Sequence, residues 1–392
     1  MSETRTIYRL RDVLEVARSP IVMKDEDDYM LASIRRRNGG MFDRETKKGR
    51  EILTKTLNRV IPGSFVISKM QVVHGACGMA PLDFGDRCIS ASYTSLLPTE
   101  PQRIDIGYLD AYATTKQSYD AFFRASHGVH IEKMTFNLEE WLNGEIELPP
   151  LPEQKKIAEI LSGIDKAINK ILQAIAKSEI TLTGVFANLD FIASSGKSGT
   201  LGEVARVQNG YAFQSSIFSE DPADIPLVRI SNISGGEVDI SKSKRIPRGI
   251  APSDEYRVNK GDILIAMSGA TTGKIGKYQG DAFCLLNQRV GKFVFRPGSD
   301  SATYVTQLLL SGFLESRILA KAAGGAQPNI SGKGIEDINI PFPDAADQGK
   351  YGGAIKELLR VNSRRRILVE KYQHLKDSIT SDLLSGRKRV TV

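Results

Sequence analysis

The chain has 392 residues, of which 41% are hydrophobic and 25% are charged, which is typical of a soluble globular protein with two or three domains. No segment approaches the ~18 uninterrupted apolar residues that a membrane-spanning helix needs, and residues 1–10 lack the apolar core of a secretory signal. Three widely separated cysteines, Cys77, Cys88 and Cys284, indicate neither a disulfide framework nor a zinc site, so we expect a cytoplasmic location and no membrane partner. The net charge of +7 favours a polyanionic partner, because lysine and arginine gain affinity for phosphates by releasing counterions.

The sequence repeats itself after roughly half of its length. Residues 10–13 resemble residues 201–204, and residues 62–67 resemble residues 260–265. Pro149 and Gln154 have their counterparts in Pro343 and Gln348. This period is too long for a solenoid repeat and indicates a duplicated pair of domain and connecting segment.

Each repeat begins with short β-rich runs that alternate with turns and helices. Runs at 64–68, 262–266 and 289–295 are bounded by glycine or by a Pro-Gly turn, which is typical of strands, and residues 302–323 are predicted to be helical. We therefore predict two α/β (α+β) globular domains in tandem, at residues 1–150 and 191–340.

A long helix is predicted after each domain, at residues 151–190 and 341–392. Pro152 marks the start of the first helix, because proline is tolerated in the first turn and not in the interior. Apolar residues then recur at alternating spacings of three and four, which is the seam of a coiled coil. The seam positions are Ile157, Leu161, Ile164, Ile168, Ile171 and Ile175 in the first helix and Ile355, Leu358, Val369, Tyr372 and Ile379 in the second. The second seam also contains Asn362, Arg365 and Lys376, and Ser178 interrupts the first. The two helices either pack on each other or lie across their own domains, and their matching registers favour the paired arrangement.

No set of catalytic residues stands out. Residues 269–275 resemble a phosphate-binding loop, but three residues rather than four precede the Gly-Lys pair and Ile275 follows it. His127 and His130 have no accompanying carboxylate or cysteine pattern that would indicate a metal site. The sequence also lacks an Asn-Pro-Pro-aromatic tetrapeptide and a Phe-x-Gly-x-Gly loop for a methyl donor. These observations favour a binding protein without a cofactor or metal of its own.

Polar and basic turns provide candidate contacts to DNA. Arginine and asparagine pair bidentately with guanine and adenine edges, and a glycine-rich turn lets the backbone and a lysine approach a phosphate. The candidates are Arg35, Arg36, Arg37, Asn38 and His127 in the first domain and Arg229, Ser231, Asn232, Thr271, Lys274, Gln327, Asn329, Ser331 and Lys333 in the second. The alternative is that the basic run is a solvated face and that the amides of the turns bond their own backbone.

Four strings are distinctive, at residues 148–157, 268–274, 286–290 and 325–330. The first resembles the proline-rich entry to the central helix in a known family, the specificity subunits of type I restriction–modification systems, and the other three resemble strings of that family's target-recognition domains. The resemblance adds Ser268, Asn287, Gln288 and Arg289 to the candidate contacts. In the first domain Ser68-Lys69-Met70-Gln71 stands where the Ser-Gly-Ala-Thr string is expected, which adds Lys69.

The resemblance implies that each domain reads one half of a gapped site in double-stranded DNA, and that the helices form an antiparallel coiled coil between the domains. It further implies two docked modification subunits that bind S-adenosylmethionine and, where the system also restricts, further subunits that use ATP and Mg²⁺. The chain itself would then carry out no chemistry. Two alternatives remain: a scaffold whose coiled coil joins two protein-binding domains, and a single-chain DNA methyltransferase or nuclease.

Overall fold

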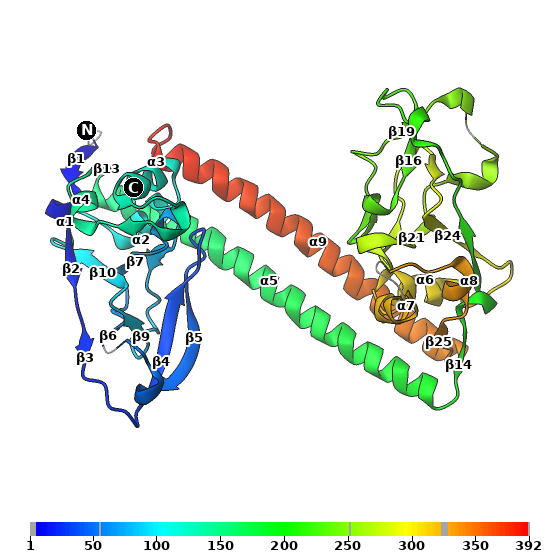
Figure 1. Cartoon of the computed structure of the whole chain (residues 1–392), viewed down its shortest axis with the longest axis horizontal. Coiled ribbons are helices and arrows are strands. Elements are labelled where there is room, and N and C mark those ends of the chain that lie inside the picture. The colour runs from blue at the N-terminus through cyan, green and yellow to red at the C-terminus, as the bar shows by residue number, and fades with distance from the viewer. Residues whose placement is uncertain (1–4, 55, 251, 323–327, 391–392) are drawn as a thin grey trace. The chain divides into compact units, whose positions relative to one another are not determined.

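The computed structural model describes residues 5–54, 56–250, 252–322 and 328–390 and divides into two compact units (Figure 1). The first unit comprises residues 1–171 and 368–392, and the second comprises residues 172–367. Each unit contains sheets and short helices together with part of two long helices, α5 (Leu151–Ser194) and α9 (Ala345–Leu384). The predicted fold class, two α/β domains in tandem with two long helices, is confirmed.

The first unit has one sheet in the order β2-β10-β7-β8 and another in the order β3-β6-β9-β4-β5. Its central strand β7 (Phe65–Ser68) is buried at every residue, because Phe65 and Ile67 pack into a core with the helices while Val66 packs into the core of the other sheet. A strand covered on both faces reads as a continuous apolar run. The other elements of the globular part are β1 (Thr6–Arg9), α1 (Leu10–Val13), β2 (Leu14–Ala17), β3 (Pro20–Ile21), β4 (Asp28–Ile34), β5 (Met41–Lys48), β6 (Leu57–Arg59), β8 (Cys77–Met79), β9 (Cys88–Ser90), β10 (Tyr93–Pro98), α2 (Ile106–Tyr112), α3 (Lys116–Arg124), β11 (Ser126–His127), β12 (Thr135–Phe136), α4 (Leu138–Leu142) and β13 (Glu145–Leu148).

The second unit has a related topology, with two more strands in its first sheet and one fewer in its second: β15-β24-β21-β22-β18-β17 and β19-β16-β23-β20. Strand β21 (Ile263–Ala266) occupies the place of β7, and its Ile263 and Ile265 likewise face the helices while Leu264 faces the opposite core. The other elements are β14 (Ser198–Thr200), β15 (Ala205–Asn209), β16 (Ile225–Val228), β17 (Ile233–Ser234), β18 (Gly236–Val238), β19 (Arg245–Ile246), β20 (Arg257–Val258), β22 (Ile275–Lys277), β23 (Cys284–Leu286), β24 (Val290–Phe295), α6 (Ala302–Leu310), α7 (Glu315–Ala322), α8 (Gly332–Glu336) and β25 (Asn339–Pro341). The strands predicted near 64–68, 262–266 and 289–295 are therefore confirmed.

The internal repeat is visible in individual hydrogen bonds. At the start of α5 the Gln154 side chain donates from Nε2 to the Pro149 carbonyl at 2.8 Å, and at the start of α9 Gln348 donates to the Pro343 carbonyl at the same distance. Antiparallel pairs of strands, β1 with β13 and β14 with β25, precede the two helices in the same way. Each repeat therefore fastens its long helix to its own domain by the same device.

The helical stretch predicted at 302–323 is not continuous. It consists of α6 and α7, and Gly312 between them has a φ of 81°. This left-handed conformation ends a helix and favours glycine, which accounts for the break. Ala323, the last residue of the predicted stretch, lies outside the described residues.

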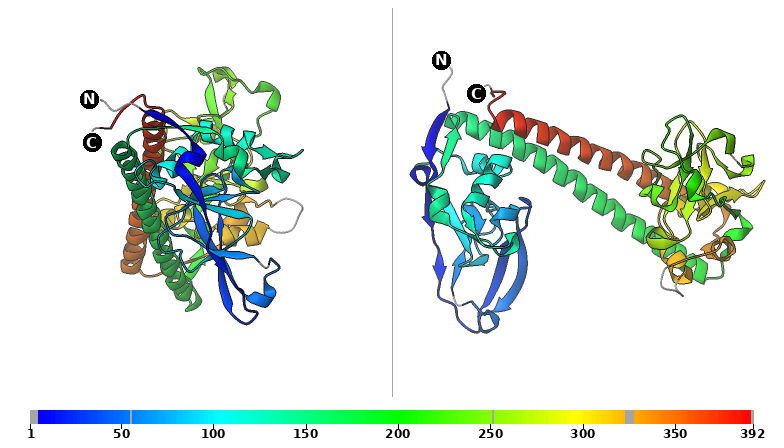
Figure 2. Two further views of the ribbon diagram at one scale, coloured as in Figure 1. Left: turned by 90° about the vertical axis from the view of Figure 1, so that its left-hand side faces the viewer. Right: turned by 45° about the horizontal axis from the view of Figure 1, so that its top comes forward.

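In the first unit α5 and α9 lie side by side and run antiparallel (Figure 2). Glu153 accepts from Arg389, which lies just beyond α9, and Asp165 accepts from Lys376, so residue numbers rise along one helix as they fall along the other. Along this part of the pair the seam residues Ile157, Leu161, Ile168 and Val369 are buried, and Ile164, Ile171, Tyr372 and Ile379 are half-buried. Arg5 donates to the Leu383 and Leu384 carbonyls and so ties the first described residue to the end of α9.

The same antiparallel packing continues within the second unit. Ile175 and Ile355 are buried and Leu358 is half-buried, while Arg366 of α9 pairs with Glu179 of α5 at 2.9 Å. Helix α5 ends at Ser194, a few residues beyond the last apolar seam position, Leu189. Among the described residues, no helix combines the length and the hydropathy needed to cross a membrane.

Candidate nucleic-acid interface

Four candidate segments that lie far apart in the sequence meet in the second unit. We call residues 228–232, 268–274, 287–289 and 328–333 the second loop cluster. The Asn287 amide donates to the Val228 carbonyl at 3.2 Å, and the Gly269 amide donates to the Pro328 carbonyl at 3.1 Å. Ser268 and Asn329 form an isolated β-bridge. The Met267 amide, next to Ser268, donates to the Arg289 carbonyl at 3.0 Å, so backbone hydrogen bonds join all four segments.

The side chains of the second loop cluster differ in their availability to a ligand. Ser231, Lys274, Gln288, Arg289, Asn329, Ser331 and Lys333 are exposed, whereas Asn232 and Ser268 are buried and Arg229, Thr271 and Asn287 are half-buried. The Thr271 hydroxyl itself is buried and has no hydrogen-bond partner. Gln327, another candidate, lies outside the described residues.

Some candidates of the second loop cluster stabilise the loops themselves. Asn232 accepts from the Arg229 amide and donates to the Asp239 carbonyl, both at 2.9 Å, so its side-chain amide holds the turn at 229–232 together. The Ser331 hydroxyl accepts from the Gly334 amide at 3.0 Å and caps α8. The buried Arg229 Nε has no hydrogen-bond partner.

Two lysines of the second loop cluster are held by carboxylates. Lys274 Nζ lies 2.5 Å from Glu315 Oε1, at the start of α7, and Lys333 Nζ lies 2.8 Å from Asp337 Oδ1. The hydrogen bond to Asp337 raises the pKa of the Lys333 ammonium. Both lysines are exposed to solvent.

A corresponding cluster exists in the first unit, which we call the first loop cluster: residues 35–40, 69–75 and 127–136. The turn after β4 places Arg37 and Asn38 at φ values of 56° and 53°, in the left-handed region that asparagine tolerates better than most residues. The Arg37 amide donates to the His74 carbonyl at 2.7 Å, and the Asn38 amide donates to the Gly75 carbonyl at 2.8 Å. The Phe136 amide donates to the Lys69 carbonyl at 2.9 Å and joins the third segment.

Asn38 is anchored inside the protein rather than directed to solvent. Its Oδ1 accepts from the Tyr119 hydroxyl at 2.7 Å, and its Nδ2 donates to the Ala113 carbonyl at 3.5 Å. The structure thus gives its side chain a positioning role in the turn that presents Arg35 to Arg37.

The other candidates of the first loop cluster are exposed or half-buried. The Arg35 guanidinium lies over the Phe42 ring, 4.2 Å from its centroid. Lys69 donates from Nζ to the Ala91 carbonyl at 3.3 Å, and His127 Nε2 lies 2.5 Å from Glu140 Oε2. Arg36 contacts both Gln71 and Glu132, at 2.8 and 2.7 Å.

The structure also corrects the alignment of the two recognition turns. Ser68 and Ala76 are joined by the same hydrogen bond as Ala266 and Lys274, each 2.9 Å long. Ser68 is therefore the counterpart of Ala266, not of Ser268, and Lys69 is the counterpart of Met267. The match of residues 62–67 to residues 260–265 already implied this alignment, because it also places Ser68 opposite Ala266.

Sequence reasoning missed several residues that the fold brings into these clusters. In the first loop cluster Gln71 and Glu132 both contact Arg36, and His74 lies next to Glu132. In the second, Tyr211 is 45% exposed, donates its amide to the Leu286 carbonyl, and packs edge-on against Tyr256. The glycine at position 210 could have indicated that the backbone beside Tyr211 approaches another segment closely. In the structure a Cβ at Gly210 would lie 2.2 Å from the Asn287 carbonyl oxygen.

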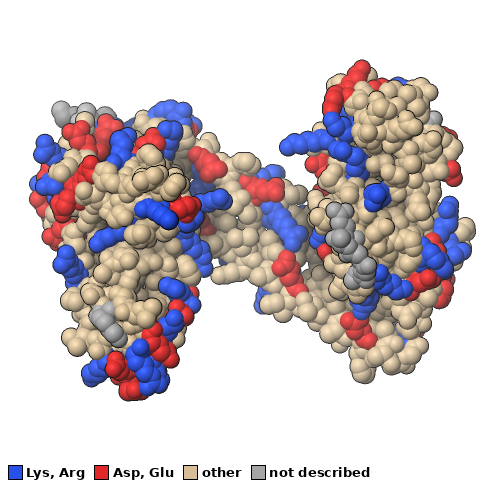
Figure 3. All heavy atoms as spheres, in the orientation of Figure 1, with Lys and Arg blue, Asp and Glu red and all other residues tan. Residues whose placement is uncertain are grey.

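Charge on the units is mixed rather than concentrated. On the face shown in Figure 3, lysine and arginine side chains lie among aspartate and glutamate in each unit. Within the described part of the chain, no group of three or more histidine, cysteine, aspartate or glutamate side chains is placed to hold a metal ion.

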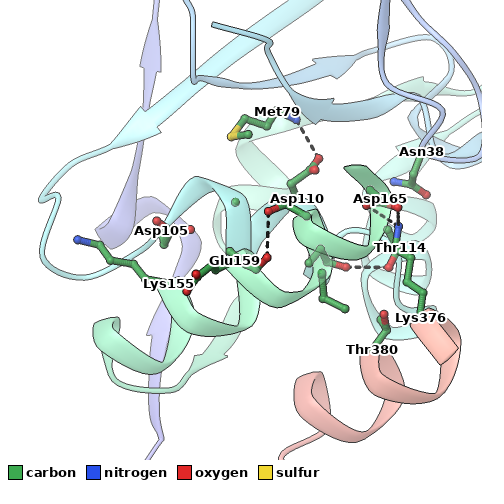
Figure 4. A pocket seen from close by; sticks show the side chains of 15 residues that line it. Asn38, Met79, Asp105, Asp110, Thr114, Lys155, Glu159, Asp165, Lys376 and Thr380 are labelled. Carbon is green, nitrogen blue, oxygen red and sulfur yellow. Dashed lines mark hydrogen bonds and ion pairs between the residues drawn. The ribbon is translucent and has the colours of Figure 1, made fainter. Parts of the chain in front are cut away.

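A cavity of about 400 Å³ lies in the first unit, between α2, α5 and α9. Figure 4 shows Lys376 meeting Asp165 at its edge and the Asp110 carboxylate accepting from the Met79 amide. Burial raises the pKa of Asp110. The lining offers no nucleophile paired with a base, so the cavity gives no reason to assign catalysis.

Comparison with protein families places this geometry in context. A family model described as the type I restriction modification DNA specificity domain matches residues 3–180 and again residues 196–370. The two matches together cover most of the chain and coincide with its two repeats.

Similar proteins and structures agree with that match. The specificity subunit of the type I restriction enzyme MjaVIII from Methanocaldococcus jannaschii is 27% identical over 328 residues, which are 78% of this chain and 76% of that protein. The EcoBI specificity subunit from Escherichia coli is 29% identical over 48% of this chain and 38% of its own length. A crystal structure of a type I restriction–modification S subunit from M. genitalium matches with a TM-score of 0.67 at 14% identity, covering 97% of this chain and 96% of that one, and shows likeness of fold.

Proposed function

This chain belongs to the type I restriction–modification DNA specificity family, as a specificity subunit with two tandem target-recognition domains, and from that premise we propose how it reads DNA. Residues 1–150 and 191–340 each read one half of a gapped, two-part site in double-stranded DNA. The first loop cluster contacts one half-site and the second loop cluster contacts the other.

The observation that carries this proposal is the convergence of the second loop cluster. Segments from four places in the sequence are locked by backbone hydrogen bonds, and they expose Gln288, Arg289 and Asn329 together. Arginine and amide side chains are the groups that distinguish guanine and adenine edges in the major groove. A rigid frame is needed because base readout depends on precise placement of such groups.

The lysines of the second loop cluster have a different task. Lys274 and Lys333 are exposed cations next to the amide and arginine side chains. Phosphate contacts fix the register of a protein on DNA without reading sequence, so we assign these lysines to the backbone. Tyr211, on the border of the same cluster, supplies an apolar surface that suits a thymine methyl group.

We assign the paired helices α5 and α9 two roles: setting the number of unread base pairs between the half-sites and docking two modification subunits. The modification subunits would bind S-adenosylmethionine and methylate adenine. Restriction subunits that use ATP and Mg²⁺ would join where the system cleaves DNA. This chain would act in the cytoplasm as a non-catalytic subunit.

The test is a methylome. The chain is expressed with the modification subunit encoded beside it in a host that lacks DNA methylation, and modified adenines are mapped by long-read sequencing. We expect one gapped motif, with methylated adenines on opposite strands of its two halves. An assembled complex without any motif would favour the scaffold alternative, and methylation by the chain alone would favour a single-chain methyltransferase.

A further inference from the structure

One carboxylate in the first loop cluster stands where a DNA-binding surface should disfavour it. Glu132 lies in the 3-10 turn Ile131–Lys133, and its Oε2 accepts from Arg36 Nη2 at 2.7 Å. Its other oxygen, Oε1, lies 3.5 Å from His74 Nε2. The Glu132 side chain is 58% exposed, so it faces any nucleic acid that approaches Arg36.

Arg36 is held on two sides. Its Nε donates to Gln71 Oε1 at 2.8 Å while its Nη2 is bonded to Glu132. An arginine fork that is already occupied gains little from a loosely placed phosphate, because the contact with Glu132 must first be given up. A guanine edge that offers two acceptors in the correct register compensates better for that loss.

Glu132 is not needed to build the turn. The Arg37 and Asn38 amides already fasten it to His74 and Gly75, and the Tyr119 hydroxyl fastens the Asn38 side chain. An exposed ion pair of this kind contributes little to stability. Folding therefore places little demand on a carboxylate at this position.

We propose that Glu132 is a specificity-determining residue: it occupies Arg36 in the absence of the correct half-site and so withholds Arg36 from the phosphates of incorrect DNA. This inference rests on the proposed reading of one half-site by residues 1–150 and adds to it a residue that acts against wrong DNA. Specificity is a difference between two affinities, and a group that competes with DNA for an arginine raises it by weakening the wrong complex.

The experiment measures binding of the assembled complex with its modification subunits to two duplexes, over a range of salt concentrations. One duplex contains the methylome-derived motif, and the other has a random sequence without it. The variants are Glu132→Gln, which keeps the volume and removes the charge, and Glu139→Gln as the matched control. Glu139 also pairs with an arginine of the same domain, Arg11, at 3.5 Å, but lies on α4, outside the first loop cluster. Both substitutions are repeated in an Arg36→Ala background.

We expect Glu132→Gln to tighten binding to the random duplex by about twofold to fivefold, the range of an exposed ion pair, and to steepen the salt dependence by about one released counterion. The preference for the motif falls accordingly. Glu139→Gln has no such effect, and Glu132→Gln loses its effect when Arg36 is alanine, because the two residues act as a pair.

Three results would overturn the inference. Binding to random DNA that stays unchanged, an equal effect of Glu139→Gln, or an effect that persists without Arg36 would each show that Glu132 does not act through Arg36. A wild-type complex that fails to distinguish the motif from random DNA would instead overturn the proposed function, before Glu132 is tested.

Discussion

Arg365 of α9 donates from Nη1 to the Ser178 hydroxyl of α5 at 2.7 Å. Ser178 is the polar interruption in the seam of α5, and Arg365 is one of the polar seam positions of α9. The same nitrogen also donates to the Ala174 carbonyl at 3.0 Å. The two breaks in the apolar pattern therefore face each other and form one polar layer, which fixes the register of the helices in the second unit.

Removing the hydroxyl should weaken this layer. Ser178→Ala leaves the half-buried Arg365 with one acceptor fewer, and we expect the free energy of unfolding to fall by about 1 kcal/mol. Thermal or urea unfolding of the purified chain measures this change. Ser162→Ala, which alters an exposed serine of the same helix that bonds its own backbone, should have no comparable effect. Equal loss in both variants would mean that helix propensity, not the Arg365 contact, is responsible.

Replacing both members of the layer should raise the stability of the chain rather than lower it. In Ser178→Leu with Arg365→Leu the seam becomes apolar at this layer, and replacing a polar pair that is removed from water by apolar residues is often stabilising, which we expect to hold for this half-buried pair too. We expect a higher melting temperature together with a less specific helix register. A melting temperature below that of Ser178→Ala would contradict this account of the layer.

The contribution of Asp110 to the stability of the folded chain should become more favourable as the pH falls. Burial raises the pKa of Asp110 in the folded chain above its usual value, so between the two values the folded chain binds more protons than the unfolded chain. Its contribution is therefore favourable at low pH and is lost as the pH rises through the folded pKa. Asp110→Asn, which can still accept from the Met79 amide, should raise the melting temperature at neutral pH by about 2–4 °C.

The control for Asp110 is Asp120→Asn, which removes an exposed carboxylate paired with Lys116. Melting curves are recorded at pH 3.5 and pH 7.5 for all three proteins. The gain from Asp110→Asn should shrink at pH 3.5, below the usual pKa of an aspartate, whereas Asp120→Asn should show no such gain at either pH. A gain of equal size at both pH values would show that titration of Asp110 does not contribute.

Asn329 tests the assignment of half-sites. Asn329→Ala should relax one position of the half-site that residues 191–340 read, with a loss of about 1–3 kcal/mol of discrimination, and should leave the other half-site unchanged. The methylome of the variant complex reports both halves at once. Arg35→Ala is the counterpart in the first domain and should relax the other half. Relaxation in the wrong half, for either variant, would refute the assignment.

Features with a regular period were predictable from the sequence. The seam residues recur every three or four positions, and a helix face of that period must be covered, so the burial of Ile157 and Ile355 follows from the pattern alone. The equivalence of Gln154 and Gln348 was likewise visible, because the proline that precedes each of them keeps the same spacing.

Features that depend on tertiary contacts were not predictable. Asn38 looked like a base-reading amide, but its partners Tyr119 and Ala113 lie far along the chain and only the fold brings them together. Glu132 escaped notice for the same reason, since nothing in residues 130–134 indicates that Arg36 lies within hydrogen-bond distance. The break at Gly312 was missed because apolar residues continue on both sides of that glycine.

The helix pair can be tested as the element that sets the spacer. Four residues inserted after Lys177 of α5, with four more inserted after Arg366 of α9, add ~6 Å to both helices at ~1.5 Å per residue, which corresponds to about two base pairs. We expect the methylome motif to keep both half-sites and to gain one or two unread base pairs. The same four residues inserted after Asp221, in an exposed turn of the second unit, should leave the motif unchanged. An unaltered gap in the helix variant, with the complex assembled and active, would show that something other than α5 and α9 sets the spacing.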